Sequence, residues 1–169
     1  MTIEQRLDQL EKRNRGLTVA LTMMAVAAIT IQFSACGEDP AGPSTNCDVS
    51  DVGALAGRDL TECDLRGANL GAANLRSADL KDANLRSANL VGANLYNANL
   101  RSANLRSANL EGADLRFADL RSANLFDANL YNANLEGADL RSADLAGANL
   151  AGANLRSANL YNANLKDAM

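Results

Sequence analysis

Residues 58–75 read RDLTECDLRGANLGAANL, and leucine returns at every fifth position of this stretch. The same spacing runs from Leu60 to Leu165, so that 22 leucines share one phase. The residue before each leucine is always Asn or Asp, and the residue two before it is Ala in 20 of the 22 cases. A period of five fits neither an α-helix, in which the leucines would drift around the axis, nor a flat strand, in which alternate leucines would face opposite ways.

A chain that turns a corner once in every repeat accounts for this period. The alanine and the leucine lie two residues apart, so they point to the same side of a short extended piece. The position two after leucine holds Gly, Ser, Asn or Asp in 19 of 22 repeats, and these residues favour turns; the exceptions are Glu62, Ala72 and Phe117. Corners that close into coils predict a solenoid with leucine and alanine inside and with the Asn or Asp side chains capping the turns.

The repeat, as in Ala68-Asn69-Leu70-Gly71-Ala72, resembles the Ala-Asn/Asp-Leu-x-x consensus of the pentapeptide-repeat family over residues 58–169. The resemblance implies an all-β solenoid, namely a right-handed quadrilateral β-helix with four repeats in each coil. The 22 repeats would then form about 5.5 coils. The resemblance brings no catalytic residue with it, and we expect a role in structure or protein binding.

Some members of this family mimic duplex DNA and bind DNA gyrase, which requires a strongly acidic rod. Residues 58–169 carry 12 basic and 13 acidic side chains, so they lack such a field. A cytoplasmic, DNA-mimicking, gyrase-binding protein therefore remains the alternative function, and nucleic acid is not an expected partner.

The composition argues against catalysis. The chain contains no histidine, which is the commonest general base and metal ligand. It also lacks the phosphate-binding, dinucleotide-binding and C-x-x-C motifs. We therefore expect no enzyme activity, no catalytic residue, no metal site and no cofactor.

The N-terminal third has the pattern of a membrane signal. Residues 1–16 form a charged, amphipathic n-region, and residues 17–35 form an uncharged stretch within the length range that can span a bilayer as a helix. Lys12, Arg13 and Arg15 precede this stretch, and Glu38 and Asp39 follow it. The positive-inside rule then places the N-terminus in the cytoplasm and the solenoid outside.

Two kinds of anchor fit this pattern. The stretch Phe33-Ser34-Ala35-Cys36-Gly37 resembles a bacterial lipobox, which would make Cys36 the lipidated first residue of the mature protein. Alternatively, residues 17–35 remain as an uncleaved transmembrane helix. In either case residues 36–57 would form a flexible linker and a degenerate cap, and the protein would be membrane-associated and exported to the cell envelope.

The two remaining cysteines lie near the start of the repeats. Cys47 and Cys63 are candidates for a disulfide that fastens the first coil, which suits an exported protein. Cys63 also occupies an alanine position, so it could serve as a small buried residue instead.

Every twentieth residue should lie on the same outer face. The position after leucine on one face holds Lys81, Arg101, Arg121 and Arg141, a candidate anion-binding ladder. Asp residues stand two before three of these cations, at positions 79, 119 and 139, and would offset their repulsion. The ladder therefore predicts either a site for an anionic polymer or a solvated face of local ion pairs. An unidentified protein partner and a homodimer through the C-terminal coil are the other interactions that we expect.

Overall fold

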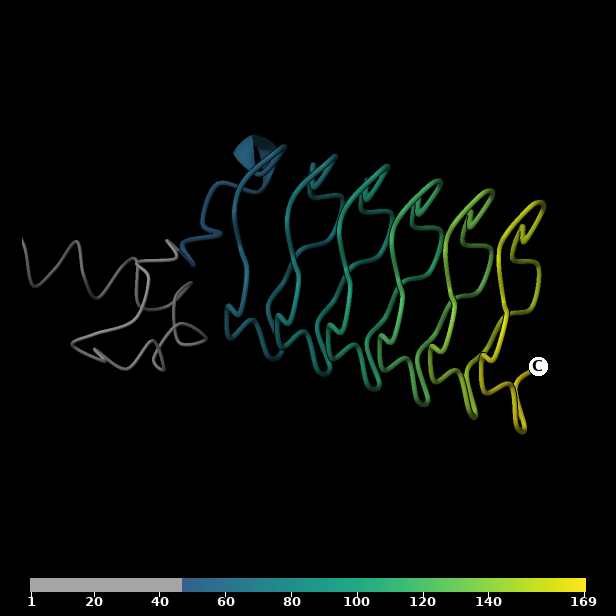
Figure 1. Ribbon diagram of the computed structural model, residues 1–169. Coiled ribbons are helices and arrows are strands. Elements are labelled where there is room, and N and C mark those ends of the chain that lie inside the picture. Colours follow the sequence, from purple (N-terminus) through teal and green to yellow (C-terminus); the bar gives the residue numbers. More distant parts are fainter. Residues whose placement is uncertain (1–46) are drawn as a thin grey trace, which may run out of the picture. The chain divides into compact units, whose positions relative to one another are not determined.

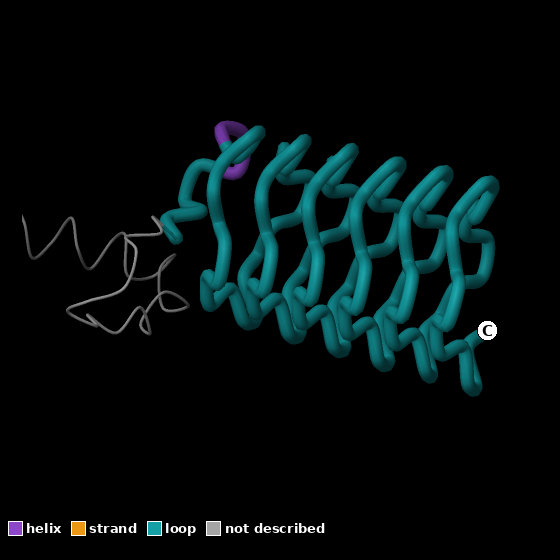
Figure 2. The backbone as a smooth tube through the Cα atoms, in the orientation of Figure 1, coloured by secondary structure: helices purple, strands orange, loops and turns teal. Residues whose placement is uncertain are grey.

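The computed structural model describes residues 47–169, which form a stack of four-sided coils (Figure 1). Parallel β-bridges join residues 20 apart, beginning with Asp59 and Asp79 and ending with Asp144 and Asn164. This spacing confirms that four repeats make one coil. Each extended piece is a single bridge long, so the tube in Figure 2 shows loop everywhere in this range except at one helical turn, η1 (Val52–Ala54).

Each repeat turns its corner through the same hydrogen bond. The carbonyl oxygen of leucine accepts from the N–H three residues later, as between Leu105 and Ala108 at 3.0 Å. The residue two after each leucine has a positive φ, from Gly57 to Asp167, and the residue before it does not. Positive φ at the second central residue alone is the pattern of a type II turn. This backbone requirement explains the Gly, Asn and Asp at that position.

The Asn or Asp before each leucine caps the same turn, as the sequence predicts. Its Oδ1 atom accepts a hydrogen bond from the backbone N–H two residues later in all 22 repeats, from Thr61 to Lys166. Asn can also donate to the coil before it, as Asn129 Nδ2 does to Asn109 Oδ1 at 3.0 Å. Both residue types supply the acceptor, so either can occupy the position.

Leucine and alanine fill the interior of the coils. The leucines from Leu55 to Leu145 are at most 3% exposed, and each coil bonds to the next through its backbone. For example, the N–H of Leu105 donates to the carbonyl of Asn124 at 2.7 Å. Burial falls in the last coil, where Leu165 is 43% exposed.

Residues 47–57 cover the first coil. Val49 is buried, and the N–H of Asn74 donates to the carbonyl of Val52 at 2.8 Å. Asp51 caps η1 by accepting from the N–H of Gly53 at 3.1 Å. The buried leucine ladder therefore extends back to Leu55, inside the predicted degenerate cap. In that repeat the helical turn η1 replaces the alanine and the asparagine.

The predicted n-region at 1–16, the apolar segment at 17–35 and the lipidation candidate Cys36 lie outside the described residues. Among residues 47–169, no helix is long and apolar enough to cross a membrane.

The bulky turn residue Phe117 is accommodated by its neighbours in adjacent coils. Its ring lies over Gly137, where a Cβ atom would come within 2.6 Å of the ring. The ring also meets Tyr96 edge-on, with centroids 5.7 Å apart. The glycine therefore supplies the space that the phenylalanine needs.

Candidate functional site

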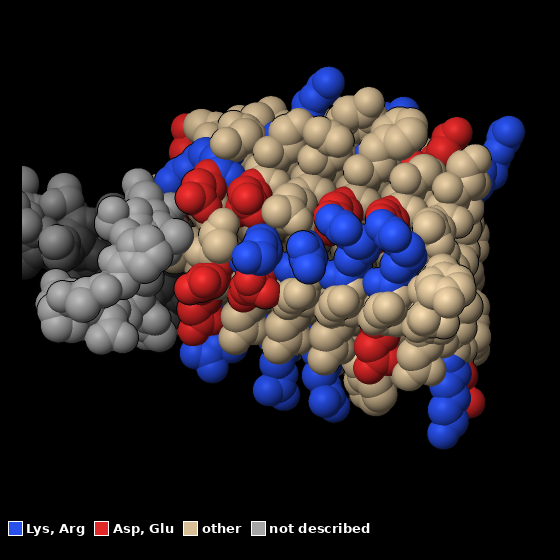
Figure 3. All heavy atoms as spheres, viewed as in Figure 1, with Lys and Arg blue, Asp and Glu red and all other residues tan. Residues whose placement is uncertain are grey.

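The predicted ladder of cations lies on one face of the coils. The residues two before its four cations are joined by successive β-bridges, so the cations stand on neighbouring coils. Figure 3 shows Lys and Arg side chains in a row along one face, with acidic side chains beside them. Six residues line a hollow of about 300 Å³ there: Arg101, Arg121, Arg141, Ser122, Ser142 and Tyr161.

Two of the arginines are held in fixed positions by carboxylates. Arg121 Nε donates to Asp119 Oδ1 at 2.7 Å, and its Nη2 atom pairs with the other carboxylate oxygen. Arg141 binds Asp139 in the same way: its Nε donates to Oδ1 at 2.8 Å, and its Nη2 pairs with Oδ2 at 2.6 Å. Arg121 Nε also lies 3.7 Å from Asp139 Oδ2, which links the two coils. The predicted offset of charge is therefore present at these two positions.

Lys81 differs from the prediction. Its ammonium group pairs with Asp82 Oδ2 at 3.4 Å and not with Asp79. The Oδ1 atom of Asp79 already accepts from the backbone N–H of Lys81 and from the amide of Asn99. Lys81 is also absent from the lining of the hollow.

Arg101 has no carboxylate beside it. The residue two before it is Asn99, whose Oδ1 accepts only from the backbone N–H of Arg101, at 3.2 Å. Within residues 47–169, the Arg101 guanidinium makes no ion pair and no hydrogen bond. The three arginines of the hollow and the two paired aspartates thus leave one net positive charge.

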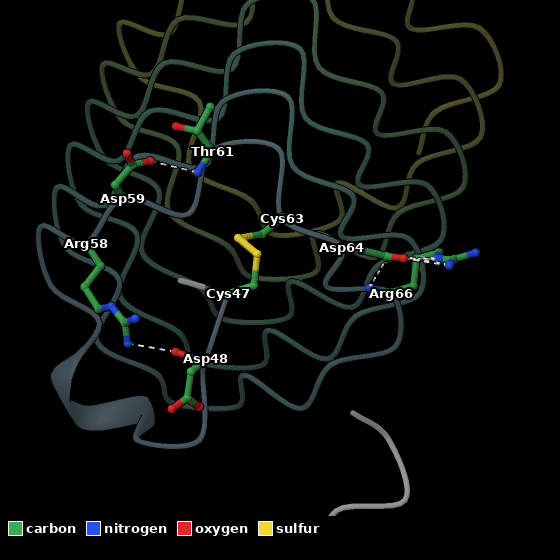
Figure 4. Close-up of a disulfide and its surroundings, with 8 residues drawn as sticks. All are labelled: Cys47, Asp48, Arg58, Asp59, Thr61, Cys63, Asp64 and Arg66. Carbon is green, nitrogen blue, oxygen red and sulfur yellow. Dashed lines mark hydrogen bonds and ion pairs between the residues drawn. A yellow bond between two sulfur atoms is a disulfide. The ribbon is translucent and has the colours of Figure 1, made fainter. Parts of the chain in front are cut away.

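The two cysteines near the start of the repeats form a disulfide in the structure (Figure 4). Their Cα atoms are 5.5 Å apart, and the bond closes a loop with a sequence separation of 16. Cys63 is 1% exposed, so it also fills the buried alanine position of its repeat. Nearby, Arg58 Nη1 donates to the carbonyl of Asp48 at 2.7 Å. These contacts join residues 47–57 to the first coil.

The sequence matches the family described as Pentapeptide repeats in 8 copies, over residues 55–90, 63–101, 78–116, 103–141 and 133–168. These matches cover more than half of the chain. The chain belongs to the pentapeptide-repeat family. Members of this family fold as right-handed quadrilateral β-helices, which agrees with the four-sided coils described above. They are generally non-enzymatic structural and interaction modules.

Two solved pentapeptide-repeat proteins resemble the chain in structure. Rfr23 from the cyanobacterium Cyanothece 51142 is 40% identical with a TM-score of 0.52, over 57% of this chain and 63% of Rfr23. AT2G44920 from the thylakoid lumen of Arabidopsis thaliana is 37% identical with a TM-score of 0.52, over 69% of this chain and 72% of its own. The chain thus spans less than two thirds of Rfr23. A search of curated proteins found no match.

A third solved structure is a weaker match. QnrB1, a plasmid-mediated fluoroquinolone resistance protein, is 22% identical with a TM-score of 0.34, over 69% of this chain and 79% of QnrB1. At this level the likeness carries no argument about what the chain binds.

Sequence reasoning missed part of the outer surface of this pentapeptide-repeat rod. Ser122 and Ser142 line the hollow and were not singled out from the sequence, whereas the 20-residue register places Tyr161 in the same column as the arginines. On another face the guanidinium groups of Arg76 and Arg116 lie 4.8 and 5.5 Å from the ring centroid of Tyr96. Cation–π contacts of this kind engage those cations within the rod, so they are less available to a ligand.

Metal binding has no candidate in this part of the chain. No group of three or more His, Cys, Asp or Glu side chains that could hold a metal ion occurs among residues 47–169.

The paired aspartates predict a dependence of stability on pH. Hydrogen bonds from Arg121 and Arg141 lower the pKa values of Asp119 and Asp139, respectively. A carboxylate with a lowered pKa stabilises the fold above its ordinary pKa of about 3.9, and this stabilisation is lost as the pH falls through its pKa in the folded protein. We expect the double substitution Asp119→Asn and Asp139→Asn to reduce the loss of stability in acid, because Asn keeps the turn cap but not the charge.

Denaturant unfolding between neutral pH and pH values below the ordinary pKa of aspartate measures this effect. Asp144→Asn is the matched control. Asp144 holds the same repeat position, but the residue two after it is Ala146 instead of an arginine, so its carboxylate has no arginine partner. An equal change in the acid dependence of the control and the double variant would contradict the prediction.

Proposed function

We propose that this chain is a non-enzymatic binding or structural module of the bacterial cell envelope, held at the membrane by its N-terminal segment. The rod of about 5.5 coils would display its outer faces to partners outside the cytoplasm. A protein or an anionic polymer is the expected partner, and a homodimer through the C-terminal coil stays a prediction.

The observation that carries the proposal is the disulfide between Cys47 and Cys63. Disulfides persist in oxidising compartments and are rare in the cytosol, where thiols are kept reduced. The bond thus supports the export that the apolar stretch 17–35 and the lipobox-like sequence at Cys36 predict. These features and the disulfide lie in separate parts of the chain, so they support export independently.

The gyrase-binding alternative would place the rod in the cytoplasm. Its 12 basic and 13 acidic side chains between residues 58 and 169 leave a net charge near zero. The arginines that line the hollow also interrupt any acidic surface on that face. The envelope role therefore remains the function that the observations support best.

The anchor is tested by producing the full chain in a bacterial host, separating membrane and soluble fractions, and measuring the mass of the N-terminal peptide. We expect membrane-bound protein that begins with an acylated Cys36, and loss of the acyl mass in a Cys36→Ser variant. Membrane-bound protein with Met1 intact would favour the transmembrane anchor and would keep the envelope proposal. Soluble protein with Met1 intact would overturn it and make a gyrase assay the next experiment.

A further inference from the structure

We propose that the hollow lined by Arg101, Arg121, Arg141 and Tyr161 binds a saccharide unit that carries a single carboxylate. The inference deepens the proposed function by naming a ligand for the module, and it rests on that function only in so far as an interaction module needs a ligand.

Charge selects a singly charged anion. Asp119 and Asp139 neutralise two of the three arginines, and Asn99 leaves Arg101 without a carboxylate partner. One net positive charge suits a carboxylate better than a phosphate monoester, which carries a charge of about −1.5 to −2 at neutral pH. An Arg fork also matches the two oxygens of a carboxylate.

The paired arginines can still donate to a ligand. Arg121 and Arg141 use Nε and Nη2 on their aspartates, and no hydrogen bond of either Nη1 group occurs among the described residues. Because the aspartates fix these side chains, the arginines lose less conformational entropy when a ligand binds.

The remaining lining suits a sugar ring. Tyr161 is 70% exposed and offers both an apolar ring and a hydroxyl group. Ser122 and Ser142 add hydroxyl groups that can donate and accept hydrogen bonds. A hollow of about 300 Å³ lies at the small end of the range for ligand sites. The lining thus combines one anion site, one aromatic wall and two hydroxyls.

The repeat itself supplies a matched pair of variants. Arg101 and Arg86 both follow Asn and Leu and both precede Ser-Ala-Asn-Leu, but Arg86 lies on another face. Asn99→Asp would place a carboxylate beside Arg101, as Asp119 lies beside Arg121, without loss of the turn cap. Asn84→Asp would do the same beside Arg86.

The test is calorimetric titration of the full chain, purified in a neutral detergent, with galacturonate, galactose and inorganic phosphate at low salt. We expect galacturonate to bind and the other two to bind much more weakly. Arg101→Ser should weaken galacturonate binding about 10-fold or more, because it removes a charge-assisted hydrogen bond. Asn99→Asp should weaken it about as much, because the new carboxylate neutralises the one unpaired guanidinium and competes with the ligand for its Nε and Nη2 donors. Asn84→Asp and Arg86→Ser should leave it unchanged.

Three results would overturn the inference: no heat of binding with galacturonate, phosphate binding as tight as galacturonate binding, or equal losses in the Arg86 and Arg101 variants. Thermal unfolding of each variant checks that the rod is intact. Because binding is measured on purified protein and anchoring on cell fractions, failure of this inference and failure of the envelope proposal are distinguishable.

Discussion

Leu105→Ala is expected to lower the free energy of unfolding by about 2–5 kcal/mol, the range for a large-to-small change in a closed core. Leu105 is fully buried, and so are Leu85 and Leu125, which hold the same position in the coils on either side. The coils are joined by backbone hydrogen bonds such as that from Leu105 to Asn124, so they cannot close in on the cavity without breaking the ladder.

Leu165→Ala provides the control for this prediction. Leu165 has the same place in its repeat, but 43% of it is exposed, so its truncation removes less buried area and leaves no closed cavity. Chemical denaturation measures both variants, and hydrogen exchange shows where each one loosens. In a solenoid each coil contacts only its neighbours, so we expect Leu105→Ala to loosen the middle of the rod and to broaden the transition. Equal losses for the two leucines would show that burial does not decide stability in this rod.

The fold could be predicted because each repeat position has the same structural role in every coil. The leucine phase fixes which side chains face inward, and the Asn or Asp before it fixes a turn cap that the structure contains in every repeat. At the start of the ladder the sequence indicates a degenerate cap, because Leu55 keeps the leucine phase, but not the helical turn that forms it. Gly53 and Ala54 break the pattern because η1 lies there, and the Val52 carbonyl takes the bond that the regular phase would assign to Gly53.

The outer surface was harder to predict than the core. The register of 20 correctly placed Arg121 and Arg141 beside Asp119 and Asp139. It could not show that Lys81 pairs with Asp82, because Asp79 and Asp82 both lie within two residues of Lys81 and its ammonium group is flexible. The hollow depends on side-chain directions across four coils, which a one-dimensional pattern does not contain.

Loss of the disulfide is expected to destabilise residues 47–57 and the first coil, while the middle of the rod stays intact. Closing a loop of about 15 residues contributes about 3 kcal/mol by restricting the unfolded chain. Cys63→Ala is a suitable change, because alanine holds that buried position in 20 of the 22 repeats and should pack without strain. Combined with Cys47→Ser, it removes the bond and keeps the consensus.

Hydrogen exchange with and without a reducing agent tests this prediction residue by residue. The amides of Asn74 and Gly57 report on the cap, since they donate to the carbonyls of Val52 and Arg76, each at 2.8 Å. The amide of Leu105 reports on the middle of the rod. Reduction and the double variant should each accelerate exchange at the first two amides and leave Leu105 protected. In a solenoid each coil contacts only its neighbours, so the loss of a contact at the first coil has little effect on the middle of the rod. Faster exchange at all three amides would mean that the disulfide stabilises the whole rod. Unchanged exchange at all three would mean that the burial of Val49 and the hydrogen bonds of the cap keep residues 47–57 in place without the disulfide.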